Sequence, residues 1–207
     1  MFSKLPKHLR HLVAFTVCYV IISALTAYLT SNIEFVFYLL VLLVLAGFTL
    51  LIHNRVHFPI SLLWCLSLWG LLHMAGGMVP IPESWHTHGP INVLYSFWLI
   101  PGFLKYDQLV HAYGFAVATW ACWECLRAIS LHQGNPVFKN TLGALTLSLF
   151  AGLGLGALNE TIEFFATLII PNTNVGDYNN TGWDLVFNLI GGLIAIYIIH
   201  KKYRPPS

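Results

Sequence analysis

The order of apolar and polar residues divides the chain into long hydrophobic runs joined by short polar stretches. A helix of about 18 or more mostly apolar residues can cross the ~30 Å hydrocarbon core of a bilayer. Runs of this length lie at about residues 11–29, 35–52, 60–79, 108–128, 141–170 and 183–200. The pattern therefore predicts an all-α, polytopic integral membrane protein with about six transmembrane helices, formed by residues 1–207 as a single membrane domain.

The polar connections on the predicted outer side differ in character. Residues 79–107 include four prolines and the amphipathic side chains of Tyr95 and Trp98. Such residues favour the headgroup region, so we expect an outer interfacial or re-entrant segment that can act as a lid. The other connection, PNTNVGDYNNTG, is rich in turn formers. Its Asn179-Asn180-Thr181 matches a glycosylation motif, a match too short to carry a conclusion.

Composition agrees with a membrane protein and predicts its orientation. With 57% hydrophobic and 9% charged residues, the chain lies well outside the range of soluble domains. If the N-terminus is cytoplasmic, nine of the ten basic residues fall on the cytoplasmic side and Lys105 falls outside, as the positive-inside rule requires. We therefore expect a bacterial inner (plasma) membrane protein with both termini cytoplasmic. The net charge of +2 reflects this topology, so the expected partners are membrane lipids and no nucleic acid.

Carboxylates inside the hydrophobic runs are the feature that hydropathy does not explain. A charged side chain near a helix centre costs about 3 kcal/mol on insertion scales, so such residues usually have partners and a function. Spacing places three pairs each on one helix face: Asp107 with His111, Glu160 with Glu163, and Asp184 with Asn188. Counted at about 1.5 Å per residue from the cytoplasmic helix ends, these pairs and His73 reach similar heights. The spacing predicts one polar cavity in the outer half of the membrane.

The residue types in this predicted cavity suit a divalent metal ion. Four carboxylates with only Lys105 nearby cannot all stay ionised in a dry pocket, so cations or protons must bind there. Carboxylate oxygens and an imidazole nitrogen are ligands that Zn²⁺, Mn²⁺ or Mg²⁺ accept. The candidate metal ligands are Asp107, His111, Glu160 and Asp184. Glu163 is the candidate general base, catalytic together with His111, and the candidate supporting or substrate-contacting residues are His73, Lys105, Asn159 and Asn188.

Other interpretations of the same residues are open at the level of sequence. The carboxylates can share protons and hydrogen bonds without a metal, or form purely structural ion pairs. Asp107 and Asp184 can each cap the start of a helix, and His73 can bond a backbone carbonyl. Capping does not explain Glu160 and Glu163, which are predicted to lie inside a helix.

Four blocks occur in order between about residues 60 and 200: HMAGG (73–77), YDQLVHAYGF (106–115), NETIEF (159–164) and GDYNNTGWDLVFNLIGG (176–192). They resemble the YjdF family of bacterial inner-membrane proteins of unknown function. The last three are also similar to the D-x-x-x-H, E-x-x-E or E-x-x-Q, and D-x-x-x-N helices of the broader VanZ-like group. The resemblance implies a six-span membrane protein and, for VanZ-like members, envelope and glycopeptide-antibiotic phenotypes. It implies no reaction, and the loop before Trp183 is shorter and richer in Asn than the YjdF pattern.

Three classes of function fit the predicted cavity. The first is a metal-dependent hydrolase or transferase acting on a lipid or lipid-linked envelope substrate in the outer leaflet. The second is a proton- or ion-coupled transporter, although six spans are few and no inverted repeat is visible. The third is a non-catalytic lipid-binding or assembly protein in which the cavity is a rigid polar plug. The sequence favours the first class and leaves open whether the protein is an enzyme.

Overall fold

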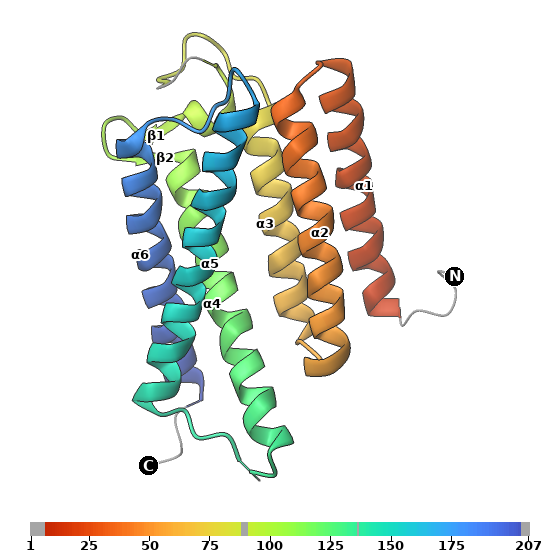
Figure 1. The fold of residues 1–207 in the computed structure, drawn as a ribbon, viewed down its shortest axis with the longest axis vertical. Coiled ribbons are helices and arrows are strands. Elements are labelled where there is room, and N and C mark those ends of the chain that lie inside the picture. The colour runs from red at the N-terminus through yellow and green to blue at the C-terminus, as the bar shows by residue number, and fades with distance from the viewer. Residues whose placement is uncertain (1–6, 88–90, 136, 204–207) are drawn as a thin grey trace.

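The computed structural model describes residues 7–87, 91–135 and 137–203, which form a bundle of long helices covered at one end by an irregular segment (Figure 1). The helices are α1 (Lys7–Leu29), α2 (Ile33–Val56), α3 (Ile60–Met78), α4 (Tyr106–His132), α5 (Leu142–Ile169) and α6 (Tyr178–Lys202). Between α3 and α4 lie the 3-10 turn η2 (Leu94–Ser96) and the strands β1 (Trp98–Ile100) and β2 (Leu104–Lys105). The predicted all-α class is confirmed, and each predicted span falls on one helix.

Five of the described helices, α1, α2, α3, α5 and α6, are long and apolar enough to cross a membrane. The prediction of a polytopic membrane protein is thereby confirmed. The run at 108–128 was expected to be a sixth apolar span, and α4 does not meet the same standard of hydropathy and charge. It carries Asp107, His111, Glu124 and Arg127. Since α4 packs against α3, α5 and α6, His111 and Glu124 are buried within the protein, whereas Arg127 is exposed.

The first residues of α4 and α6 show whether the candidate residues Asp107 and Asp184 act as helix caps. Asp177 is the N-cap of α6 and accepts the backbone N–H of Asn180 at 3.0 Å. Asp184 therefore lies inside the helix, and the capping interpretation of this residue is wrong. Lys105 is the N-cap of α4, so Asp107 is likewise not the cap. It lies in the first turn, where the helix dipole favours a negative charge.

The segment between α3 and α4 folds over one end of the bundle (Figure 1). Strands β1 and β2 pair antiparallel, with Trp98 opposite Lys105. An isolated bridge joins Pro80 to Val93, and the hydroxyl of Ser96 donates to the carbonyl of Ile91 at 2.6 Å. The position at the bundle end fits the interfacial alternative predicted for this segment.

A close approach of α4 and α6 brings their polar faces together. A Cβ atom added at Gly191 of α6 would lie 1.9 Å from the backbone oxygen of Ala112 in α4. No side chain fits there, so glycine sets the distance between the two helices. Small residues such as Gly191 allow membrane helices to approach closely in this way.

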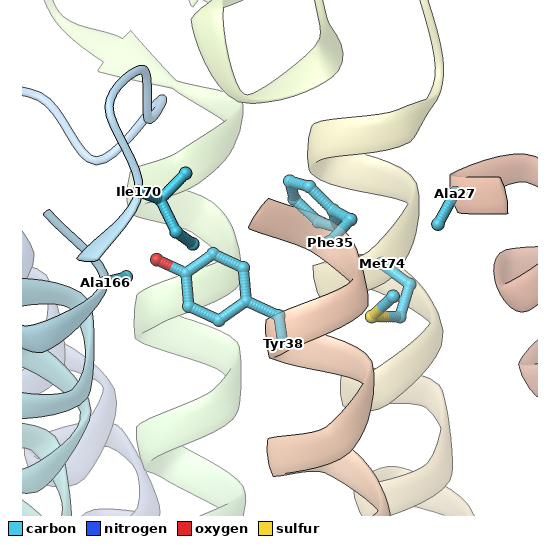
Figure 2. Close-up of a cluster of buried hydrophobic side chains, with 6 residues drawn as sticks. All are labelled: Ala27, Phe35, Tyr38, Met74, Ala166 and Ile170. Atoms are coloured by element: carbon cyan, nitrogen blue, oxygen red, sulfur yellow. The ribbon is translucent and has the colours of Figure 1, made fainter. Parts of the chain in front are cut away.

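Apolar packing joins the remaining helices near the same end of the bundle. Figure 2 shows a buried cluster that draws on α1, α2, α3 and α5: Ala27, Phe35, Tyr38, Met74, Ala166 and Ile170. The Tyr38 hydroxyl points towards α5 in this view. By contrast, Val44, Phe48 and Leu51 on the outer face of α2 are exposed, as expected for side chains that contact lipid.

Candidate functional site

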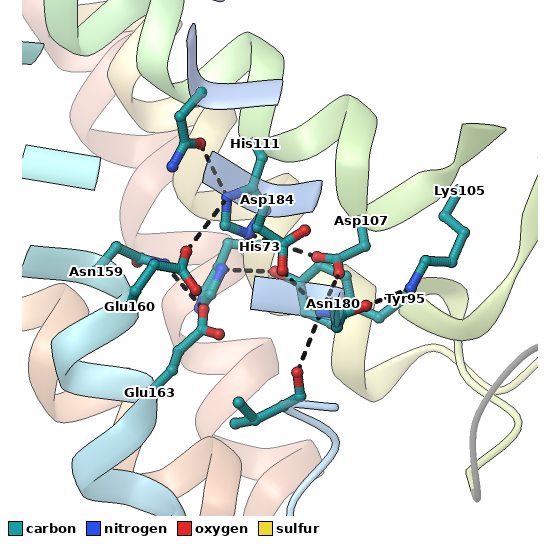
Figure 3. Close-up of polar contacts among 12 residues, drawn as sticks. His73, Tyr95, Lys105, Asp107, His111, Asn159, Glu160, Glu163, Asn180 and Asp184 are labelled. Carbon is teal, nitrogen blue, oxygen red and sulfur yellow. Dashed lines mark hydrogen bonds and ion pairs between the residues drawn. The ribbon is translucent and has the colours of Figure 1, made fainter. Parts of the chain in front are cut away.

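The centre of the candidate site is His111, a buried side chain near the start of α4 (Figure 3). Its Nε2 atom lies 3.6 Å from Oδ1 of Asp107, one helical turn earlier. On the other side of the ring, Nδ1 lies 3.0 Å from Oδ1 of Asn188 in α6 and 3.8 Å from Oε1 of Glu160 in α5. Three helices thus converge on one imidazole.

The contact with Asn188 determines which ring nitrogen of His111 is free. Asn188 is 0% exposed, and its amide oxygen can only accept a hydrogen bond. This oxygen faces Nδ1 at 3.0 Å and accepts its hydrogen bond in the tautomer that carries the proton on Nδ1. The lone pair then lies on Nε2, the atom that faces Asp107. A histidine held in this way by a carbonyl oxygen presents Nε2 as a metal ligand.

Asn180, to which the sequence assigned no role, holds two carboxylates of the cluster. Its amide nitrogen donates to Oδ2 of Asp184 at 2.7 Å and lies 3.3 Å from Oδ2 of Asp107, and it also contacts the carbonyl of Val175. The Lys105 ammonium donates to the amide oxygen of Asn180. Oδ1 of Asp107 faces Nε2 of His111, and Oδ1 of Asp184 has no hydrogen-bond partner among the described residues.

Lys105 acts through Asn180 rather than on the carboxylates directly. Its ammonium also lies 6.0 Å from the ring centroid of Trp98 in β1, and the side chain is buried. In Figure 3 the contacts run from Lys105 at one edge, through Asn180 and Asp107, to His111, and Asp184 joins them through Asn180. Lys105 was predicted as a supporting or substrate-contacting residue, and the structure places it in contact with Asn180.

The acidic face of α5 approaches His111 from the side opposite Asn180 (Figure 3). The amide nitrogen of Asn159 donates to Oε1 of Glu163 at 2.8 Å. Within the described part of the chain, neither carboxylate oxygen of Glu160 has a hydrogen-bond partner. Glu163 is thus oriented by a neighbour on its own helix, whereas Glu160 has its ion contact with His111.

Two overlapping groups of side chains can hold a metal ion. One consists of Asp107, His111 and Asp184, and the other of His111, Glu160 and Glu163. In each group the ligand atoms lie within 4.8 Å of one another. Metal–ligand bonds of about 2.1 Å place opposite ligand atoms at most about 4.2 Å apart, so small side-chain movements close either group around an ion. The predicted set of four ligands spans both groups, which meet at His111.

His73 lies next to this cluster and is bonded to the outer segment. Its Nδ1 atom lies 2.5 Å from the hydroxyl of Tyr95, and its ring packs edge-on against Tyr38. Burial, and then the nearby Asp107 and Glu163, raise the pKa of Tyr95 well above its usual value. Tyr95 therefore stays protonated and donates to His73. The predicted alternative, a bond from His73 to a backbone carbonyl, is replaced by this side-chain contact.

Asn180 and Tyr95 were not identified as site residues from the sequence, for two different reasons. Asn180 precedes Asp184 by one helical turn, as Asp184 precedes Asn188, so all three share a face of α6. That spacing was a usable signal once the helix was known to start at Tyr178. Tyr95 comes from the irregular segment, where no periodicity indicates which way a side chain points.

Comparison with known proteins gives a family and no activity. Residues 9–204 match the family described as Predicted membrane protein (DUF2238). No curated protein and no solved structure matches the chain. The matched region contains every residue of the cluster around His111. The chain, with its multi-pass helical bundle and buried His, Asp and Glu cluster, therefore belongs to the DUF2238 family of predicted membrane proteins.

Proposed function

We propose that the protein is a membrane-embedded, metal-dependent hydrolase or transferase with its active site around His111. The observation that carries this proposal is the carboxylate of Asp184. It is 1% exposed, and its Oδ1 has no hydrogen-bond partner among the described residues. Its other oxygen, Oδ2, accepts only the neutral amide of Asn180, and an ionised carboxylate buried without a cation is strongly destabilising. A cation between Asp184, Asp107 and Nε2 of His111 removes that penalty.

The donor set indicates which ions are suitable. Asp107 and Asp184 offer hard oxygen atoms, and His111 offers one imidazole nitrogen. Mn²⁺ and Zn²⁺ accept this mixture, and Mg²⁺ accepts the oxygen atoms. Glu160 is the candidate fourth ligand; it faces Nδ1 of His111, so its side chain must move to reach an ion at Nε2. Such an ion supplies Lewis acidity and lowers the pKa of water.

Glu163 is proposed as the general base. A base must lie near the reacting atoms and be oriented by a further group. Glu163 shares a potential ligand group with His111 and receives a hydrogen bond from Asn159. It takes the proton from an attacking water or hydroxyl group. Asn188 and Asn180 are positioning residues, which orient the imidazole and the two aspartates.

The substrate is proposed to be a lipid or a lipid-linked envelope component. The cluster lies at the bundle end covered by the segment between α3 and α4, where headgroups reach a spanning protein (Figure 1). The distribution of Lys and Arg assigns this end to the outer side of a bacterial inner membrane, with both termini cytoplasmic. The motifs resemble those of YjdF-like proteins, which are bacterial inner-membrane proteins, and of VanZ-like proteins, which have envelope phenotypes. Both resemblances agree with a substrate at this side of the membrane.

Metal content tests the proposal directly. The full chain is purified in detergent, stripped with a chelator, dialysed separately against Mn²⁺, Zn²⁺ or Mg²⁺, and analysed by inductively coupled plasma mass spectrometry. We expect about one ion per chain from at least one of these metals, and less than about a tenth of that for His111→Ala. Glu124→Gln is the matched control, because Glu124 is a buried acid of the same helix that pairs with Arg127. Wild-type protein that binds none of the three ions contradicts the proposal.

Turnover separates catalysis from metal binding. Purified protein is incubated with labelled total membrane lipids, and products are identified by mass spectrometry. Glu163→Gln is expected to lower product formation at least about 100-fold, the usual contribution of a general base. The same variant keeps its ion if Asp107, His111 and Asp184 are the ligands. A Glu163→Gln protein with wild-type turnover excludes the assigned role.

A further inference from the structure

Two neighbouring cavities lie beside the His111 cluster. The inner cavity has a volume of about 20 Å³ and is lined in part by Glu34, Phe35, Tyr38, Tyr95, Asp107 and Glu163. The outer cavity has a volume of about 230 Å³. Glu34 and Asn174 line both cavities, and Asp107 and Glu163 belong both to the inner cavity and to the two potential metal groups. The two cavities therefore adjoin each other at Glu34 and Asn174, and the inner one borders the candidate active site.

The lining of the inner cavity suits a cation. Its charged groups are the carboxylates of Glu34, Asp107 and Glu163, and the described lining contains neither Lys nor Arg. Lys105 instead donates to Asn180. The walls also include the aromatic rings of Phe35, Tyr38 and Tyr95. Carboxylates and aromatic faces together attract ammonium groups.

The two glycines of the HMAGG block hold this aromatic wall in place. A Cβ atom at Gly77 would lie 1.6 Å from the ring of Phe35, and one at Gly76 would lie 2.6 Å from the ring of Tyr95. The rings therefore rest directly on the backbone of α3. Tyr38 packs edge-on against Phe35, with ring centroids 5.5 Å apart. The wall is formed before any ligand arrives, so little ordering is required on binding.

Glu34 is a buried carboxylate with capacity for another donor. Both of its oxygens accept the same backbone N–H, that of Asn174, at 3.0 and 3.1 Å. An ionised carboxylate can accept about four hydrogen bonds. Glu34 lies in the first turn of α2, where the helix dipole favours its negative charge. It is well placed to receive N–H donors from a ligand in either cavity.

The sizes and linings of the cavities indicate the shape of the ligand. A cavity of about 20 Å³ has room for one group the size of water or ammonium, and a trimethylammonium group is too large. The outer cavity combines polar Thr30 and Asn32 with apolar Met78, Ile91 and Val93. Such a lining fits the part of an amphiphile where a polar head meets hydrocarbon.

We propose that these cavities bind the head of a lipid that carries a primary ammonium, with the ammonium between Glu34, Asp107 and Glu163. The proposed binding site is supported by the residues that line the cavities. Its role as the substrate site rests in addition on the proposed function. The ammonium brings the adjoining bonds of the headgroup near Glu163, which lines the inner cavity and belongs to a potential metal group with His111.

A headgroup comparison on the wild-type chain tests the proposal without any substitution. Full-length protein in detergent is titrated with phosphatidylethanolamine, phosphatidylcholine or phosphatidylglycerol of the same acyl chains, and bound lipid is counted by native mass spectrometry. We expect phosphatidylethanolamine to bind at least about tenfold more tightly than the other two, because only it offers a small charged donor. Equal binding of the three lipids overturns the proposal. Ethanolamine that binds as tightly as the whole lipid overturns the assignment to a lipid.

Variants test the named carboxylate. Glu34→Gln is expected to lower the affinity for phosphatidylethanolamine at least about tenfold and to leave phosphatidylglycerol binding unchanged. Glu83→Gln, which removes an exposed carboxylate of the outer segment, is the matched control and is expected to bind like wild type. Unchanged affinity in folded Glu34→Gln overturns the proposal. If Glu34→Gln does not fold, the wild-type comparison decides.

The two proposals fail separately. Glu34→Gln is expected to keep wild-type metal content, since Glu34 belongs to neither potential metal group. A wild-type protein that prefers phosphatidylethanolamine but binds no metal retains the ammonium site and loses the proposed catalysis. If the protein binds metal at the His111 cluster but shows no headgroup preference, the metal site is retained and the ammonium site is excluded.

Discussion

Carboxylates are buried near both ends of α4, and the two regions differ in the partners that these carboxylates have. At one end Glu124 is 3% exposed, lies 3.2 Å from the guanidinium of Arg127, and accepts the indole N–H of Trp120 at 3.2 Å. At the other end Asp184 packs beside α4 with Oδ1 unpartnered among the described residues.

The difference separates a structural acid from a candidate ligand. Glu124 has a cation and a neutral donor, so its burial is compensated within the protein. The acids around His111 have one imidazole and the neutral side-chain amides of Asn180 and Asn159 as partners, and none of them forms an ion pair with Lys or Arg among the described residues. A site that is incomplete by itself and rigidly held is suited to a bound cation.

The largest expected effect comes from separating the helices that bring the acids together. Gly191→Ala places a methyl group 1.9 Å from the oxygen of Ala112, so we expect a loss of at least about 3 kcal/mol in the free energy of unfolding. The same substitution at Gly182 of α6 meets no atom within 4 Å and is the control. Thermal unfolding followed by circular dichroism in detergent measures both. Similar melting temperatures for the two variants exclude the assigned role of Gly191.

The next effect tests the comparison itself. Asp184→Asn is expected to weaken metal binding at least about 100-fold, because a ligand is lost. In chelator-treated protein the same change is expected to raise stability by about 1 kcal/mol, because an unpartnered buried charge disappears. Glu124→Gln is expected to keep the metal and lose stability, because its pairing with Arg127 is broken. Metal titration and thermal unfolding of both variants give the result, and equal behaviour removes the distinction between the two ends.

A smaller effect is expected from the residue that positions the aspartates. Asn180→Ala removes the amide that contacts Asp184 and Asp107, and we expect metal affinity to fall about 10- to 100-fold. Asn179→Ala, at the exposed neighbouring position, provides the control. Metal affinity is measured by competition with a fluorescent chelator. Equal affinities for the two variants mean that Asn180 positions nothing.

The smallest effect belongs to an exposed acid. The backbone N–H of Asn180 lowers the pKa of Asp177 below its ordinary value. The resulting contribution to stability is present above the unfolded pKa of about 3.9 and is lost as pH falls through the folded pKa. Asp177→Ala is expected to lower the melting temperature slightly at pH 7 and not at all once pH is below both values. A deficit that persists at the lowest pH points to a cause other than the carboxylate charge.

Much of the fold was predictable because a bilayer restricts the choices. Hydrophobic length predicted every described helix, and the α5 prediction of 141–170 differs from Leu142–Ile169 by one residue at each end. The α6 prediction began at residue 183, five residues late, because Asp177 starts the helix in a polar turn that hydropathy does not register. Hydropathy also predicted α4 as an ordinary apolar span, although it carries buried polar side chains such as His111 and Glu124 and packs against α3, α5 and α6.

The candidate site was predictable in part for the same reason. Residues spaced by three or four share a helix face whatever the helix packs against, so the pairs of Asp107 with His111 and of Asp184 with Asn188 followed from sequence. Which atoms meet did not follow. That the Nε2 atom of His111 is left for a metal depends on the position of Asn188 across a helix interface.

The sequence by itself determined that this is a helical membrane protein with acids and a histidine on particular helix faces, because length, hydropathy and periodicity are local properties of the chain. Only the tertiary structure decided that Asn180 joins two aspartates, that Tyr95 reaches His73, and that Glu34 meets Asn174 between two cavities. These contacts join residues distant in the chain or lying in irregular segments. They depend on how closely backbones approach, as at Gly191 and Ala112.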